Sequence, residues 1–186
     1  LEAFEYALEL GCAYIETDVQ LSADGIPYIF HDDNLLRLLG RETLFNSLNS
    51  SEIDNLRLFD SYQIPKLKAA LDKFPEALFQ IDVKTDEVAM PALKVIEECN
   101  SLNRICIASF SSDRLKKVNN AYPEVCLSMG PKEVVKLLLA SFGLYRKKIP
   151  GNCLQIPIYQ YGIKLVTQRF VDYVQSIRVF VFFYGI

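Results

Sequence analysis

Two carboxylates and the single histidine of the chain lie within one short stretch, residues 14–33. Glu16 and Asp18 alternate with apolar or β-branched residues, so in a strand both acids point to the same face. Two ionised acids on one face repel each other and favour either a bound cation or a shared proton. Asp24-Gly25 predicts a chain reversal, after which a second apolar strand leads to His31. The stretch is therefore predicted to be two strands joined by a turn, with a metal or proton site near their ends.

A later strand, predicted over 77–83, adds a third carboxylate and a cation. Asp82 and Lys84 share one face of this strand because they are two residues apart. Oxygen ligands without a cluster of Cys or His favour a hard ion such as Mg²⁺ or Ca²⁺ over zinc. Such an ion can hold a phosphate oxygen, Lys84 can add a second positive charge, and His31 can move a proton. Metal-assisted hydrolysis of a phosphodiester is the reaction that fits this set.

The composition is that of a packed globular protein. The 186 residues suffice for one domain, and a net charge of -3 gives no electrostatic footprint for nucleic acid. Five widely spaced cysteines are interpreted as buried, reduced thiols, without a CxxC pair for zinc or redox work. Membrane contact is not expected, because the basic residues 146–148 end what looks like an ordinary barrel helix. A cytoplasmic protein is expected, with an export signal upstream of Leu1 left open.

Around the candidate site, helices and strands alternate with short connections, which predicts a parallel sheet. Without a G-x-G-x-x-G or Walker sequence, the pattern favours a closed barrel over an open nucleotide-binding sheet. Residues 34–63 are predicted to be a long irregular loop, functional or mobile. Helices are predicted over 1–10, 66–74, 87–99, 112–121, 132–144 and 167–176, and later strands over 104–110, 124–129, 153–158 and 178–183.

Three sequence blocks resemble the signature of the glycerophosphodiester phosphodiesterase family. They are residues 16–19 (ETDV), 23–27 (ADGIP) and 30–37 (FHDDNLLR), and weaker similarity continues at 79–84 (FQIDVK) and beyond. The resemblance implies a (β/α)₈ TIM barrel. It also implies metal-dependent hydrolysis of glycerophosphodiesters to sn-glycerol 3-phosphate and an alcohol, or of lysophospholipids in some members.

The same resemblance implies a role for each candidate residue. Glu16, Asp18 and Asp82 become the ligands of one divalent cation, Ca²⁺ or Mg²⁺, although the family often has Glu where Asp82 stands. His31 becomes one of two acid/base histidines, and Lys84 becomes a phosphate contact.

The departures from the family pattern concern its ends. Family members begin with a strand ending in His-Arg-Gly, which we expect immediately upstream of Leu1, and they close with an eighth strand. Residues 1–186 are therefore expected to be a single barrel domain truncated at both ends, with little or no activity alone on glycerophosphocholine. The alternatives are a truncated non-catalytic relic or binding module, or another barrel hydrolase or lyase with an acidic metal site. The oligomeric state stays open.

Overall fold

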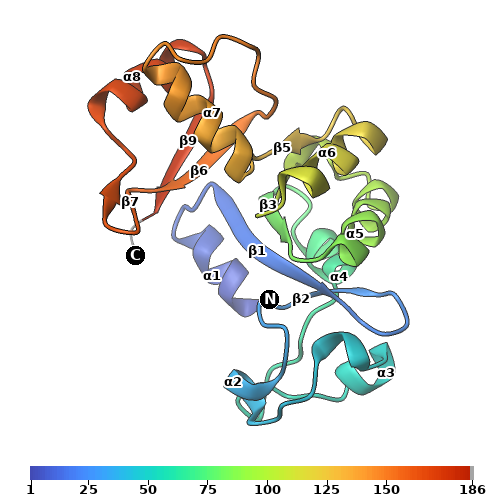
Figure 1. Ribbon diagram of the computed structural model, residues 1–186. Coiled ribbons are helices and arrows are strands. Elements are labelled where there is room, and N and C mark those ends of the chain that lie inside the picture. The colour runs from blue at the N-terminus through green and yellow to red at the C-terminus, as the bar shows by residue number, and fades with distance from the viewer. Residues whose placement is uncertain (185–186) are drawn as a thin grey trace. The chain divides into compact units, whose positions relative to one another are not determined.

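The structure is a computed structural model that describes residues 1–184. The chain divides into two compact units, Leu1–Ile107 and Ala108–Ile186, and each is described by itself (Figure 1). Helices alternate with strands in both units, as the sequence predicts. That residues 1–186 form a single domain stays a prediction.

The first unit is organised around β1 (Tyr14–Leu21), which pairs with strands on both sides. It runs antiparallel to β2 (Pro27–Ile29) and parallel to β3 (Leu78–Val83), and β4 (Ile105–Ala108) follows β3 in the sheet. The predicted reversal between β1 and β2 is confirmed, and Gly25 takes the positive φ of 84° that only glycine adopts easily. The parallel pairing places Asp18 opposite Asp82, so the two acidic strands are neighbours in register.

Helices cover the apolar face of this sheet. Ile15, Thr17 and Val19 are buried, and both α1 (Glu2–Glu9) and α5 (Asp86–Glu98) lie against β1. The hydroxyl of Thr85 accepts a hydrogen bond from the Val88 backbone N–H and so begins α5. The sheet therefore has one helix-covered face, and its polar residues gather on the other.

The segment between β2 and α4 (Leu67–Lys73) differs from the predicted irregular loop. It contains α2 (Leu36–Leu39), the short 3₁₀ helix η1 (Phe45–Ser47) and α3 (Ser50–Ile53), and Figure 1 shows α2 and α3 below β2. We call residues 34–63 the excursion. Its apolar side chains pack with those of β2 and of the chain that follows it, in a cluster of Tyr28, Phe30, Leu35, Phe45, Ile53 and Ile64. Aromatic stacking and local caps thus order a segment whose sequence has no helical or strand period.

The second unit repeats the alternation of helix and strand. Its elements are α6 (Ser112–Ala121), β5 (Cys126–Leu127), α7 (Pro131–Ser141), β6 (Cys153–Pro157), α8 (Gln168–Ser176) and β9 (Phe180–Tyr184). Strands β6 and β9 are parallel, and α7 packs against α8. A small hairpin, β7 (Tyr159–Gln160) and β8 (Ile163–Lys164), was not predicted from the sequence.

In the first unit, the short 3₁₀ helix η2 (Leu102–Arg104) leads into β4.

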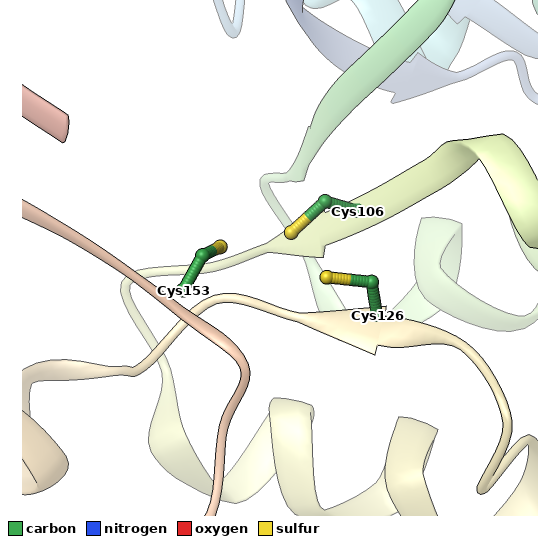
Figure 2. Close-up of side chains that lie close together, drawn as sticks. All are labelled: Cys106, Cys126 and Cys153. Atoms are coloured by element: carbon green, nitrogen blue, oxygen red, sulfur yellow. The ribbon is translucent and has the colours of Figure 1, made fainter. Parts of the chain in front are cut away.

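The cysteines are only partly in the predicted buried state. Cys106 of the first unit and Cys153 of the second are buried, whereas Cys12 is exposed. Cys126 on β5 is half-buried, and its sulfur lies within 4.8 Å of the Cys153 sulfur on β6 (Figure 2).

Within the described chain, every helix is too short or too polar to cross a lipid bilayer.

Candidate metal centre and acid/base site

The centre of the candidate site is a pair of aspartates that share one lysine. Asp18 of β1 and Asp82 of β3 are register partners, and both contact the ammonium of Lys84, one residue past the end of β3. The Lys84 Nζ atom lies 2.6 Å from Asp18 Oδ1 and 3.2 Å from Asp82 Oδ2. Asp82 is buried and Asp18 is half-buried, so the positive charge compensates two acids that have lost much of their hydration. The predicted meeting of these three residues is found in the structure.

Glu16 lies on the same face of β1, two residues before Asp18. Its side chain is exposed, unlike those of its neighbours Ile15 and Thr17. Partial desolvation raises the pKa of its carboxyl, and repulsion by Asp18 and Asp82 raises it further. Lys84 and His31 act in the opposite direction and lower that pKa, so both groups are close enough to act on Glu16. The five titratable groups therefore form one electrostatic cluster with Glu16 at its edge.

The donor set fits a hard divalent cation. It offers carboxylate oxygens only, on neighbouring strands, and a cation already lies between two of them in the form of the Lys84 ammonium. The same two carboxylates raise the pKa of Lys84, in spite of the opposing effect of burial. Among the described residues, the three carboxylates do not lie within 4.8 Å of one another as a set. Joint coordination therefore requires the exposed Glu16 side chain to turn toward the two aspartates.

His31 is placed beside these carboxylates by the end of the β1–β2 pairing. The backbone N–H of Phe30 donates to the Asp18 carbonyl at 3.1 Å, so His31 leaves the strand next to the acidic face. Its side chain is 64% exposed, which leaves the imidazole accessible to a substrate. The imidazole Nδ1 lies 2.6 Å from Asp32 Oδ1.

Asp32 determines which nitrogen of His31 faces outward. Arg37 lies 2.7 Å from the other oxygen of Asp32, and these bonds lower the pKa of the Asp32 carboxyl. An ionised carboxylate only accepts hydrogen bonds, so Nδ1 of His31 must be the donor, which leaves Nε2 for a reaction partner. From the sequence, Asp32 and Arg37 could be interpreted as residues that only hold the loop after His31 in place. The sequence feature that points to the orienting role of Asp32 is its position directly after the histidine.

Asp33 does hold this loop in place. The side-chain amide of Gln20, which is buried on β1, donates to Asp33 Oδ1 at 3.1 Å and to the Asp32 carbonyl at 3.3 Å. These bonds hold the chain that follows His31 against the sheet.

The whole chain, residues 1–186, matches the model of the glycerophosphoryl diester phosphodiesterase family. The chain belongs to this family. The family match agrees with the resemblance seen in the three signature blocks, and all five candidate residues lie in the first unit.

Individual family members agree with this membership. The chain is 31% identical over 171 residues to a probable glycerophosphodiester phosphodiesterase 2 of Mycobacterium tuberculosis, covering 89% of this chain. It spans 65% of the length of that relative.

Solved structures of the family show the fold. The glycerophosphodiester phosphodiesterase of Thermotoga maritima matches with a TM-score of 0.77 and 21% identity, covering 100% of this chain and 78% of that protein. An Oleispira antarctica phosphodiesterase, solved with the product sn-glycerol-3-phosphate, matches with a TM-score of 0.79 and 19% identity, covering 100% and 77%. The predicted (β/α)₈-barrel fold class is thereby confirmed.

Proposed function

We propose that this chain carries the metal and acid/base half of a glycerophosphodiester phosphodiesterase. The observation that carries the proposal is the register-paired Asp18 and Asp82 around one cation, in a chain of this family. The substrate would be a glycerophosphodiester, and the products would be sn-glycerol 3-phosphate and an alcohol. A lysophospholipid is the second substrate class, because one relative at 26% identity is a human lysophospholipase D.

Glu16, Asp18 and Asp82 would hold one divalent cation, either Ca²⁺ or Mg²⁺. Such an ion, when bound, withdraws electron density from a phosphate oxygen and offsets negative charge in the transition state. Two aspartates and a glutamate would neutralise the ion, and Lys84 would then be released from its double contact to hold a second phosphate oxygen. The lysine would thus serve as a placeholder for the ion and as a ligand of the substrate.

Hydrolysis forms a bond from a water oxygen to phosphorus, breaks the bond from phosphorus to the alcohol oxygen, and moves one proton to that leaving oxygen. We assign this proton transfer to Nε2 of His31. Because Nδ1 donates to Asp32, Nε2 of the neutral imidazole is the free base that takes a proton from the attacking water, and the imidazolium so formed can pass that proton to the leaving oxygen. The chain has a single histidine, so any second acid/base histidine would come from outside residues 1–186. We place the reaction in the cytoplasm, where thiols such as Cys12 stay reduced.

Calorimetric titration with Ca²⁺ and with Mg²⁺ tests the metal ligands. Glu16→Gln, Asp18→Asn and Asp82→Asn should each weaken binding by at least about tenfold, because each removes one anionic ligand. Asp72→Asn is the matched control, since Asp72 also contacts a lysine, Lys68, at 2.7 Å but lies on α4. Unchanged affinity in the three variants would refute the ligand set.

The acid/base assignment is tested in the full-length gene product with glycerophosphocholine as substrate. His31→Asn should lower kcat by about 100-fold or more, the usual contribution of a positioned acid/base group. Equal kcat in the two proteins would refute the role of His31.

A further inference from the structure

One buried polar group of the first unit has no role in the site described so far. Gln80 on β3 is only 5% exposed, and its side-chain nitrogen Nε2 is buried without a hydrogen-bond partner within the described part of the chain. Buried amide donors are nearly always satisfied in folded proteins, so an unsatisfied one indicates a further state in which it finds an acceptor.

The register of the sheet indicates which acceptor that is. Gln80 is the Cα partner of Glu16 on β1, and the two side chains share the face that carries Asp18 and Asp82. Adjacent strands lie about 4.8 Å apart, whereas Asp82 is two residues farther along β3, about 6.6 Å away. The contact of Asp82 with Lys84 involves its Oδ2 atom, so it is the distance along the strand that separates the Asp82 carboxylate from Gln80. Glu16 is thus the nearest carboxylate on this face.

We propose that Gln80 is a positioning residue for the metal centre. When the exposed Glu16 side chain turns toward Asp18 and Asp82, the Nε2–H of Gln80 donates to one of its carboxylate oxygens. The other oxygen is then directed at the cation. This inference rests on the proposed function, because it assigns Gln80 to the same cation site.

The test is Ca²⁺ titration of the 186-residue chain with Gln80→Met, which keeps the length of the side chain and removes the donor. Binding should weaken about tenfold, as is usual when the hydrogen-bond partner of a metal ligand is lost. The melting temperature without metal should not fall, because the donor makes no hydrogen bond in that state. If Gln80 had a purely structural role, Gln80→Met would instead lower the melting temperature without metal.

Gln20→Met is the matched control. Gln20 is a second buried glutamine of the same sheet, and its amide already donates to Asp32 and Asp33. Its loss should lower the melting temperature without metal and leave the Ca²⁺ affinity unchanged. If Gln80→Met does not fold, Gln80→Leu serves the same comparison.

A double-mutant cycle shows whether Gln80 acts through Glu16. In the Glu16→Gln background, Gln80→Met should cause no further loss of Ca²⁺ affinity. Unchanged affinity after Gln80→Met alone, or an equal loss in both backgrounds, would overturn the inference. Absence of Ca²⁺ binding by the unaltered chain would instead overturn the metal site of the proposed function, which separates the two failures.

Discussion

At the scale of single residues, the contact between His31 and Asp32 has a spectroscopic consequence. Because the chain has one histidine, its imidazole nitrogens give a single set of NMR signals. Neutral His31 should carry its proton on Nδ1, which faces Asp32 at 2.6 Å. This is the less common tautomer of a free histidine side chain, so the contact with Asp32 must favour it.

Asp32→Asn should shift neutral His31 toward the Nε2–H tautomer, because an amide can donate to Nδ1 and a carboxylate cannot. Nitrogen-15 chemical shifts measure the two populations directly. Asp33→Asn is the control, since Asp33 contacts Gln20 instead. An Nε2–H tautomer already dominant in the unaltered protein would contradict the assignment.

The lysine between the two aspartates gives a second prediction. Lys84→Met leaves Asp18 and Asp82 to repel each other at a half-buried position, which should cost roughly 3 kcal/mol of unfolding free energy without metal. Added Ca²⁺ should restore more stability in this variant than in the parent, because the ion replaces the missing charge. Urea unfolding with and without Ca²⁺ measures both effects, and equal Ca²⁺ stabilisation in the two proteins would argue against a shared site.

At the scale of elements, Asp24 of the β1–β2 turn connects the sheet to the excursion. Its carboxylate accepts hydrogen bonds from the backbone N–H and the hydroxyl of Ser50, at the start of α3. The bonds from Ser50, with help from Ser22, lower the pKa of Asp24 to about 2. Asn49 is the N-cap of α3, and Asp24 adds an anion at the first residue of that helix, where the helix N-terminus favours negative charge.

The stability from Asp24 should therefore depend on pH. Because its pKa is lower in the folded than in the unfolded protein, its contribution is fully present above about pH 4 and is lost as the pH falls toward 2. Asp24→Asn should lower the urea midpoint at pH 7, and the difference from the parent should shrink as the pH falls. Asp60→Asn, at an exposed aspartate of the excursion, is the control for the removal of one negative charge.

Arg104, at the end of η2, stabilises the end of α4. Its guanidinium donates to the carbonyls of Leu71, Phe74 and Ala77 at 2.8–2.9 Å, which lie in the last turn of the helix and in the turn after it. Arg104→Met should cost about 3 kcal/mol of unfolding free energy, and Arg104→Lys should recover only part, since an ammonium cannot span three carbonyls. Chemical denaturation of both variants checks this, and full recovery by lysine would contradict it.

The sequence predicted most elements but not all contacts within the site. A period of two placed Glu16 and Asp18 on one face, and the Asp24-Gly25 turn brought His31 next to them. The excursion was missed because short helices held by aromatic stacking leave no periodic signal. The double contact of Lys84 and the bond from His31 to Asp32 depend on side-chain torsions, which alternation along a strand does not determine.

At the scale of the whole molecule, binding of one cation should be visible as heat resistance. A ligand at one hundred times its Kd stabilises the folded state by about 2.7 kcal/mol. For a chain of this size, that corresponds to a rise in melting temperature of about 5–10 °C. Differential scanning fluorimetry with Ca²⁺, with Mg²⁺ and with K⁺ as the monovalent control measures it. An equal rise with K⁺ would indicate charge screening instead of a site.

The excursion and the strand before His31 share one aromatic contact. The ring of Phe30 stacks on that of Phe45 at 4.7 Å, one residue before the histidine. For protein engineering, this makes residues 34–63 a replaceable cassette with three fixed requirements. A segment grafted from a relative must bring a flat ring to the position of Phe45, a guanidinium to that of Arg37, which contacts Asp32, and a hydroxyl to that of Ser50, which contacts Asp24.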